Sequence, residues 1–169
     1  SFLPGGAYTT LRTYQYSKAL HLSDHIQRLG ETASLAGHPL PIVEEGLRSA
    51  LRRAMDAYRS LHPQILNQDL RIRLTVDLDT HPGDAFIAVE SLTTPPPTAY
   101  TEGVAAVTCQ MERSLPEAKL TRFIQRSQPV RNILPAGVNE ALMVNTDGAI
   151  TEGLSSNFAR SNPVFGSKH

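Results

Sequence analysis

Cysteine and tryptophan are nearly absent from this chain, whose 169 residues include one cysteine and no tryptophan. A single cysteine cannot form an internal disulfide bond, which excludes the disulfide-rich class of small secreted proteins and favours a reducing compartment. Cys109 stands in the alternating segment GVAAVTCQM. We therefore expect a small buried hydrophobic side chain at this position rather than a nucleophile.

Net charge and long apolar runs are absent as well. Lysine and arginine together number 16, as do aspartate and glutamate, so the formal net charge is zero. A neutral chain is a poor electrostatic partner for nucleic acid or for a membrane surface. No apolar run approaches the roughly 20 residues that cross a bilayer, and the first residues show no basic-then-apolar targeting signal. These absences predict a soluble, cytoplasmic protein that binds neither nucleic acid nor membrane.

Residues 1–92 predict an amino-terminal α+β domain, in which two helices cover an antiparallel sheet. Apolar residues at helical spacing predict one helix with Ser23 as its N-cap and Gly37 at its end, and a second from Pro41 to Leu61 with a solvated basic face. Segments rich in β-branched and aromatic residues predict the strands Ala7–Gln15, Ala19–Leu22, Leu70–Leu78 and Asp84–Leu92.

A proline-rich segment then divides the chain. Residues 93–103, TTPPPTAYTEG, contain three successive prolines, which predicts a stiff extended linker. Residues 104–169 form the second predicted domain, which begins with a strand over Val104–Met111.

The stretch from Lys119 to Asn157 carries the candidate chemistry. A helix-like segment follows Lys119, then a GVNEALMVN strand and a tight NTDG turn, and Glu152 follows the lysine by 33 residues in a TEG turn. A lysine and an acid on neighbouring elements suit pyridoxal phosphate (PLP), because the lysine forms a Schiff base and the acid partners the pyridinium nitrogen. Most such pairs are ordinary surface charges, so the pair alone is a weak signal.

The spacing around this pair resembles the class IV aminotransferases. In that family a lysine is followed 18 residues later by a glycine. The motif x-[DN]-E-A-L comes next, and then a strand, an N/D-x-[DE]-G turn and E-G-x-x-[ST]-N-[FIL]. The amino-terminal segments GAYTTLR and HIQRL resemble the family's G-x-[FY]-x-[TG]-[LI]-R and H-[LIM]-x-R-L. The positions that match the first pattern without a gap are Lys119, Gly137, Asn139, Glu140, Ala141, Leu142, Asp147, Gly148, Glu152, Gly153, Ser156, Asn157 and Phe158.

The resemblance implies a role for several side chains. Lys119 would bind PLP covalently and shuttle the proton, and Glu152 would keep the pyridine nitrogen protonated. Arg28 would bind the cofactor phosphate, for which a planar, permanently charged guanidinium is well suited. Tyr8 would face the substrate, although a tyrosine packed in the strand core is almost as good an interpretation. His25 would be structural rather than an acid–base catalyst, and no metal is expected.

The resemblance also implies an architecture and a reaction. The fold would be a two-domain α+β class IV fold, in which the amino-terminal sheet with two helices precedes an incomplete carboxy-terminal α/β barrel-like domain, with the cofactor in the cleft between domains. The protein would be a homodimer that moves an amino group between an α-amino acid and a keto acid, with branched-chain-like specificity. An aminodeoxychorismate-lyase-like reaction and a truncated inactive homologue, acting only as a folded or interaction domain, remain as alternatives.

Departures from the family pattern limit these expectations. The family's distant G-[IV]-T-R segment, which also holds the phosphate, has no counterpart before the chain ends, so we expect the 169 residues alone to transaminate slowly at best. Ala159 replaces an aromatic residue, and Arg122 and Ile124 replace an asparagine and a tyrosine found in some members. The segment Val76–Asp79 replaces the T-R-G with which D-amino-acid enzymes bind the substrate carboxylate, which argues against a D-amino-acid substrate.

Overall fold

The computed structural model describes residues 4–157. These residues form two compact units, each of which has its own sheet. The first unit comprises Ser1–Pro95 together with Leu115–Gln125, and the second comprises Pro96–Ser114 together with Arg126–His169. The segment that contains Lys119 therefore packs with the first unit, whereas the sequence-based division placed all of residues 104–169 in the second domain.

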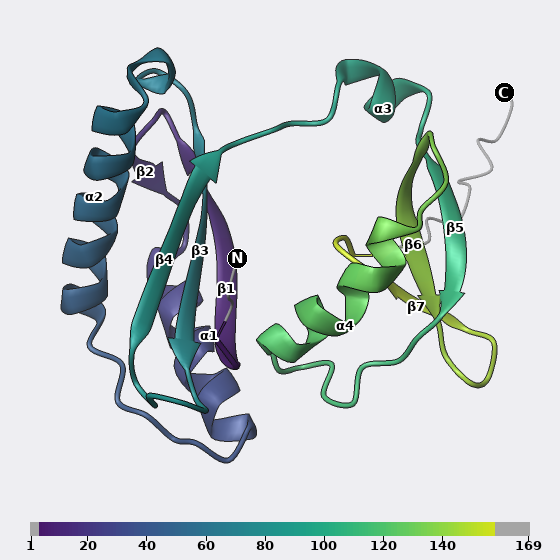
Figure 1. Ribbon diagram of the computed structural model, residues 1–169, viewed down its shortest axis with the longest axis horizontal. Coiled ribbons are helices and arrows are strands. Elements are labelled where there is room, and N and C mark those ends of the chain that lie inside the picture. The colour runs from purple at the N-terminus through teal and green to yellow at the C-terminus, as the bar shows by residue number, and fades with distance from the viewer. Residues whose placement is uncertain (1–3, 158–169) are drawn as a thin grey trace, which may run out of the picture. The chain divides into compact units, whose positions relative to one another are not determined.

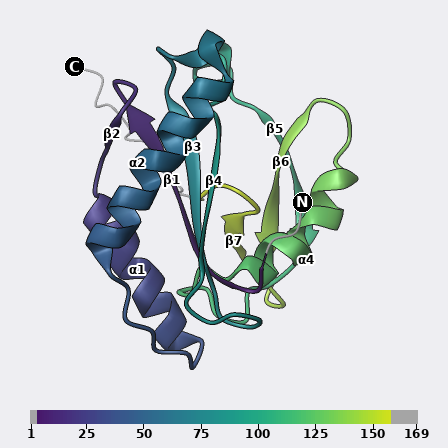
Figure 2. The same cartoon turned by 60° about the vertical axis from the view of Figure 1, so that its left-hand side comes forward.

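The sheet of the first unit is antiparallel, as predicted, and has the strand order β2-β1-β3-β4. Two helices lie on one of its faces (Figures 1 and 2). Side chains of β1 alternate across the sheet, so that Thr9 and Leu11 point into the core between sheet and helices and Tyr8 and Thr10 point to the other face. The strands are β1 (Gly6–Tyr14), β2 (Lys18–Ala19), β3 (Leu70–Asp77) and β4 (Ala85–Ser91).

The first helix, α1 (Leu22–Leu35), packs on β1 and buries the apolar stripe of Ile26, Leu29 and Ala33. Ser23 is not its N-cap. The N-cap lies two residues earlier, at His21, whose left-handed backbone (φ 52°) redirects the chain, and no side chain caps the helix. The end is as predicted, because Gly37 adopts a φ of +86°, which residues with a Cβ rarely do.

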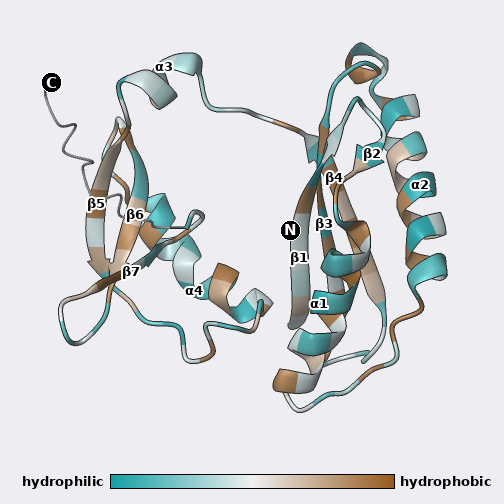
Figure 3. Ribbon diagram, turned by 180° about the vertical axis from the view of Figure 1, so that it is seen from behind, coloured by the Kyte–Doolittle hydropathy of each residue, from teal (hydrophilic) through white to brown (hydrophobic). Residues whose placement is uncertain are grey.

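The second helix, α2 (Glu44–Leu61), packs on β4 and buries Leu47, Leu51 and Met55. It begins three residues after the predicted Pro41. Hydrophobic and hydrophilic segments alternate along it in Figure 3. On its basic face, the guanidinium of Arg48 forms an ion pair with the Glu44 carboxylate at 2.6 Å. A short 3-10 turn, η1 (Pro63–Ile65), leads from this helix to β3.

Asp77 organises the turn between β3 and β4. Its side chain is 1% exposed, and its carboxylate accepts the backbone N–H groups of Asp79 at 2.8 Å and of Thr80 and His81 at 3.1 Å. Burial raises the pKa of this carboxyl, but the three donors outweigh burial and hold the pKa below its ordinary value of 3.8. Asp77 is therefore an ionised turn cap.

The substitution Asp77→Asn is expected to lower the free energy of unfolding by about 2 kcal/mol at neutral pH, because an amide accepts these N–H groups less strongly than a carboxylate. Because the pKa of Asp77 is lower in the folded protein than in the unfolded chain, the ionised carboxylate stabilises the folded state above pH 3.8. This contribution is lost as the pH falls through the folded-state pKa. The loss relative to wild type should thus shrink below about pH 3.8. Urea unfolding at several pH values measures it.

Asp84→Asn is the matched control, because Asp84 lies exposed in the same turn. Equal effects of the two substitutions at neutral pH would contradict the assignment of Asp77 as the turn cap.

The linker is only partly extended. After the extended Pro96, a short helix α3 (Pro97–Thr101) forms where a stiff extended linker was predicted. Pro97 stands in the first turn of this helix, where its missing N–H has no intrahelical partner to lose and its fixed φ already suits the helix.

The second unit contains a three-stranded sheet of order β5-β6-β7, in which β5 and β6 are parallel and β7 is antiparallel to β6. The NTDG turn forms as predicted, with the Asn145 side chain accepting the backbone N–H groups of Asp147 and Ala149. The elements are β5 (Ala105–Gln110), α4 (Thr121–Asn132), β6 (Val138–Val144) and β7 (Ile150–Gly153). The division between the two units falls within α4, after Gln125. No helix in residues 4–157 is long and apolar enough to cross a membrane.

Candidate functional site

The backbone of Lys119 is held on both sides by the first unit. Its carbonyl oxygen accepts the N–H of Tyr8 at 2.8 Å, and its own N–H donates to Thr32 Oγ1 at 3.4 Å. The neighbouring Ala118 and Leu120 are 2% and 7% exposed. Since Tyr8 pairs with β3 on its other side, Lys119 lies along the opposite edge of β1. The lysine therefore has a defined position on the sheet edge.

Thr121 reinforces this attachment. Its side chain is fully buried, accepts the N–H of Gly6 and donates to the carbonyl oxygen of Pro4, both at 2.8 Å. The close approach of β1 to β3 also requires Gly6, because a Cβ there would lie 1.9 Å from the carbonyl oxygen of Val76. Through the backbone of Lys119 and the side chain of Thr121, this segment is bonded to α1, to β1 and to the residues just before β1.

Two basic side chains of α1 lie near Lys119. The Nδ1 atom of His25 is 2.7 Å from Thr9 Oγ1. Burial lowers the pKa of His25, and the charges of Arg28 and then Lys119 lower it further, so these three side chains lie within electrostatic range of one another. Arg28 is exposed, and its side chain makes no hydrogen bond or ion pair within residues 4–157. This arrangement suits an anionic group such as a phosphate.

Tyr8 is not grouped with these residues. It is half-buried, and strand alternation places its side chain on the face of the sheet opposite to Thr9, and hence opposite to His25. Tyr8 contributes its backbone N–H to the Lys119 attachment, while its ring lies on the face that α1 does not cover.

In the second unit, Glu152 is held by an arginine that the sequence analysis did not identify. Arg113 Nη1 lies 3.3 Å from Oε1 and 3.2 Å from Oε2 of Glu152. The two side chains are 10% and 26% exposed, so the pair is largely removed from water. Thr151, Glu152 and Gly153 belong to strand β7 rather than to the predicted turn, because β7 pairs with β6. The strand and Arg113 together orient this carboxylate.

The Glu140 carboxylate fixes the turn that follows Glu152. Its Oε2 atom accepts the N–H and hydroxyl of Ser155 at 3.1 and 2.7 Å and the hydroxyl of Ser156 at 2.9 Å, and Oε1 accepts the Ala141 N–H at 3.0 Å. Burial raises the pKa of Glu140, but these hydrogen bonds outweigh it and hold the pKa below 4.5. Gly153 is needed beside them, because a Cβ there would lie 2.3 Å from Ser156 Oγ.

Glu140→Gln is expected to lower the free energy of unfolding by about 2 kcal/mol, because the amide replaces an ionised acceptor of several hydrogen bonds. Urea unfolding measures the loss. Glu112→Gln is the control, since Glu112 is exposed and its side chain makes no bond within residues 4–157. A Glu140→Gln protein as stable as the control would show that this carboxylate does not hold the turn.

Cys109 is half-buried rather than buried, because it lies on β5, an edge strand of the sheet. Burial, together with the nearby Glu140 carboxylate, raises the pKa of its thiol. The protonated thiol favoured by this shift fits the expectation that Cys109 is not a nucleophile.

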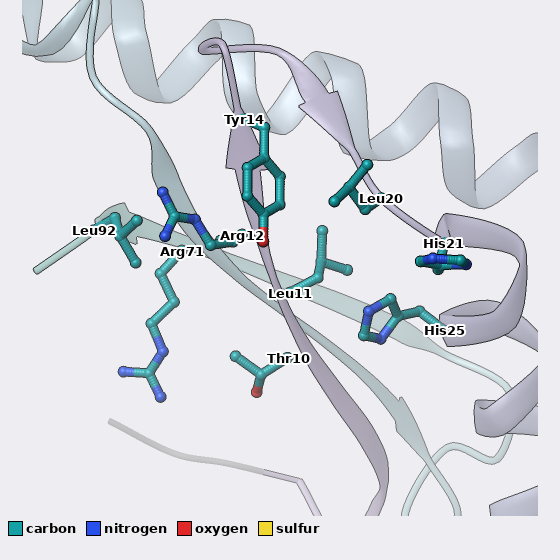
Figure 4. Close-up of a pocket in the computed structure, with 9 residues that line it drawn as sticks. All are labelled: Thr10, Leu11, Arg12, Tyr14, Leu20, His21, His25, Arg71 and Leu92. Atoms are coloured by element: carbon teal, nitrogen blue, oxygen red, sulfur yellow. The ribbon is translucent and has the colours of Figure 1, made fainter. Parts of the chain in front are cut away.

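The first unit also has a cavity of about 460 Å³ beside His25. Figure 4 shows the rings of His21 and His25 on one side of it and the guanidinium of Arg71 on the other. Both arginines of the lining are already paired, Arg12 with Asp69 at 3.1 Å and Arg71 with Glu90 at 3.0 Å. The cavity therefore offers less to an anion than the exposed Arg28 does.

Comparison with known proteins gives this geometry a context. The model of the class IV amino-transferase family matches residues 6–161. The chain belongs to this family. A search of the curated proteins gave no match. Among the described residues, no three histidine, cysteine, aspartate or glutamate side chains come together as a metal site.

Solved class IV structures share the fold, which confirms the predicted two-domain α+β architecture. A hypothetical aminotransferase from Mycobacterium tuberculosis, with α-ketoglutarate and PMP bound, has a TM-score of 0.67 and 21% identity over 89% of this chain and 56% of its own. A fold IV transaminase from Curtobacterium pusillum has a TM-score of 0.65 and 18% identity over 89% and 54%. A 4-amino-4-deoxychorismate lyase from Pseudomonas aeruginosa has a TM-score of 0.57 and 15% identity over 90% and 57%. The chain thus spans just over half the length of these proteins.

Two departures from the class IV pattern can now be placed. Asp77, at the position of the family's T-R-G segment, is buried as a turn cap. Arg122 is exposed in the first turn of α4, next to the buried Thr121. Phe158 and Ala159 lie outside the described residues.

Proposed function

We propose that this protein is a PLP-dependent aminotransferase that moves an amino group between an α-amino acid and a keto acid. The observation that carries the proposal is the position of Lys119, whose backbone is bonded to β1 and α1 and whose charge acts on His25 together with that of Arg28. Membership of the class IV family supports it, as does the related Mycobacterium tuberculosis protein, which has been solved in PLP-bound and PMP-bound forms.

The residues present fit such a cofactor. Arg28 offers an uncommitted guanidinium to a phosphate, and the amine of Lys119 lies within electrostatic range of the same histidine. In the second unit, Glu152 offers an oriented carboxylate to a pyridine nitrogen, with Arg113 holding both of its oxygens. Each unit thus supplies groups of the kind that PLP requires.

In this proposal each residue has a defined task. PLP, when bound, supplies the electron sink that stabilises a carbanion at the substrate Cα. Lys119 would hold the cofactor through Nζ, and its free amine would take the proton from the substrate Cα as general base. Arg28 binds the phosphate, and Glu152 keeps the pyridine nitrogen protonated. Tyr8 is proposed to face the substrate, with its ring on the uncovered face of the first sheet.

We propose a branched-chain-like L-amino acid as the amino donor. Asp77 argues against a D-amino acid, because the family's D-amino-acid enzymes have an arginine in the T-R-G segment, whereas Asp77 is buried and committed to three backbone N–H groups. A homodimer and a cytoplasmic location are proposed from the family resemblance and from the single cysteine. Analytical ultracentrifugation tests the dimer.

A lyase that acts on aminodeoxychorismate is the second candidate, favoured by lyases of that kind among the similar structures. Visible absorbance after PLP is added tests cofactor binding, which both enzyme candidates require and an inactive homologue does not. Transfer of the amino group from leucine to a keto acid supports the aminotransferase. Turnover of aminodeoxychorismate without amino transfer would establish the lyase instead, and no PLP binding would overturn both.

A further inference from the structure

A second cavity of the first unit lies apart from the residues assigned to PLP. It has a volume of about 440 Å³, within the roughly 300–1,000 Å³ typical of small-molecule pockets, and it lies among α2, the start of α1 and the β1–β2 hairpin. Figures 1 and 2 show β2 beside α2 in this part of the unit. Its apolar lining includes Leu22, Leu51 and Met55, the last two of which are also core residues.

Three arginines of α2 line the same cavity, and they differ in how they are bonded. Arg48 is neutralised by Glu44 at 2.6 Å. Arg52 is exposed, and its side chain makes no hydrogen bond or ion pair with any residue of 4–157. Arg59 donates one guanidinium N–H to the carbonyl oxygen of Tyr16, while its Nε is buried and has no acceptor.

A buried N–H without an acceptor is costly, because it has lost its bond to water and gained none in exchange. Arg59 Nε is such a donor, and the Arg52 guanidinium supplies a permanent charge at the same cavity. Asp56 also lines the cavity but forms no ion pair with either arginine. The three arginines carry three positive charges, and Asp56 and Glu44 carry two negative charges, so one positive charge is in excess at this cavity. The charge balance therefore favours an anion with one negative charge.

We propose that this cavity binds a small organic monoanion, namely a carboxylate with an apolar body. The carboxylate accepts hydrogen bonds from the guanidinium of Arg52, for which this planar group is well suited, and lies beside the positive charge of Arg59. The apolar body lies against Leu51 and Met55, where its burial is favourable. A second negative charge on the ligand would face Asp56, which disfavours dianions. This binding site is separate from the proposed enzymatic function and does not depend on it.

The test is to titrate sodium octanoate into the 169-residue protein in the absence of PLP. The backbone amide signals in two-dimensional NMR spectra report the binding. Saturable shifts are expected for residues that line the cavity, such as Ala19, Leu22 and Arg52. The uncharged 1-octanol should bind at least about fivefold more weakly, because it lacks the charge that the arginines recognise. Absence of saturable shifts at these residues, or equal binding of the alcohol, would overturn the proposal.

Variants of neighbouring arginines locate the site. Arg52→Gln and Arg59→Gln should each weaken octanoate binding about fivefold. Arg53→Gln removes the same charge from the next position of α2, which does not line the cavity, and should leave the affinity unchanged. Because the Arg52 side chain is exposed and makes no hydrogen bond or ion pair within residues 4–157, its replacement should preserve the fold even if loss of the Arg59 bond to Tyr16 loosens the hairpin. An Arg52→Gln protein that binds octanoate like wild type would refute the site.

Discussion

Borohydride reduction of the PLP-treated protein is expected to attach the cofactor to Lys119. The sequence contains three lysines, Lys18, Lys119 and Lys168, so peptide mapping distinguishes them without ambiguity. The expectation rests on the bonds that hold the Lys119 backbone to Tyr8 and Thr32, because covalent attachment to a cofactor requires an amine held in one place. Lys119→Arg should abolish the labelled peptide and the visible absorbance, since a guanidinium keeps the charge but does not act as the nucleophile.

Lys18→Arg is the matched control. Lys18 is exposed, and its side chain bonds only to Gln15, at 2.6 Å, within the described residues, so its replacement should leave the labelling unchanged. Label on Lys18 or Lys168, or persistent label in the Lys119→Arg protein, would refute the assignment of Lys119.

Arg28→Ala is expected to weaken PLP binding by about a hundredfold or more. Arg28 is exposed in the free protein, and the bound cofactor would cover its contact with the phosphate; truncation of one partner of such a covered, hydrogen-bonded charge pair costs about 2–5 kcal/mol, and 1.4 kcal/mol corresponds to a factor of ten. The fold should be preserved, because Arg28 is exposed on α1 and its side chain makes no bond within residues 4–157. Equilibrium dialysis against PLP gives the affinity, and circular dichroism checks the fold.

Arg53→Ala controls for the loss of one positive charge, because Arg53 is also an exposed arginine and lies on the other helix of the same unit. Lys119→Arg helps to interpret the outcome, since it removes the covalent bond but keeps the phosphate contact. If Arg28→Ala and Arg53→Ala bind PLP equally well, the phosphate site lies elsewhere.

Local patterns in the sequence predicted most of the secondary structure. The alternation in AYTTLRTYQ and the helical spacing of Ile26, Leu29 and Ala33 are properties of short segments, in which each residue's burial follows from its position within one element. Errors arose where one bond or backbone angle outweighed a local preference. Ser23 has the chemistry of an N-cap, yet the left-handed His21 begins the helix, and Pro97 begins a helix inside the proline-rich linker.

The pairing of Arg113 with Glu152 shows why part of the candidate site was missed. The two residues are 39 positions apart, and no periodic pattern relates them. They meet because Arg113 follows β5 and Glu152 lies on β7, two strands of one sheet. The Glu140 bonds to Ser155 and Ser156 have the same origin, since they join β6 to the turn after β7.

By itself, the sequence determined the types of element, the candidate roles of Lys119 and Glu152 through the spacing of a known family, and the neutral, cysteine-poor character of the chain. Only the tertiary structure decided that residues 115–125 pack with the first unit, that Lys119 is bonded to Tyr8 and Thr32, and that Asp77 is a buried turn cap. Lys119 and Thr32 are 87 residues apart. Such bonds form only after strands and helices have packed, and the packing of distant segments is not encoded in the local periodicity from which the elements were predicted.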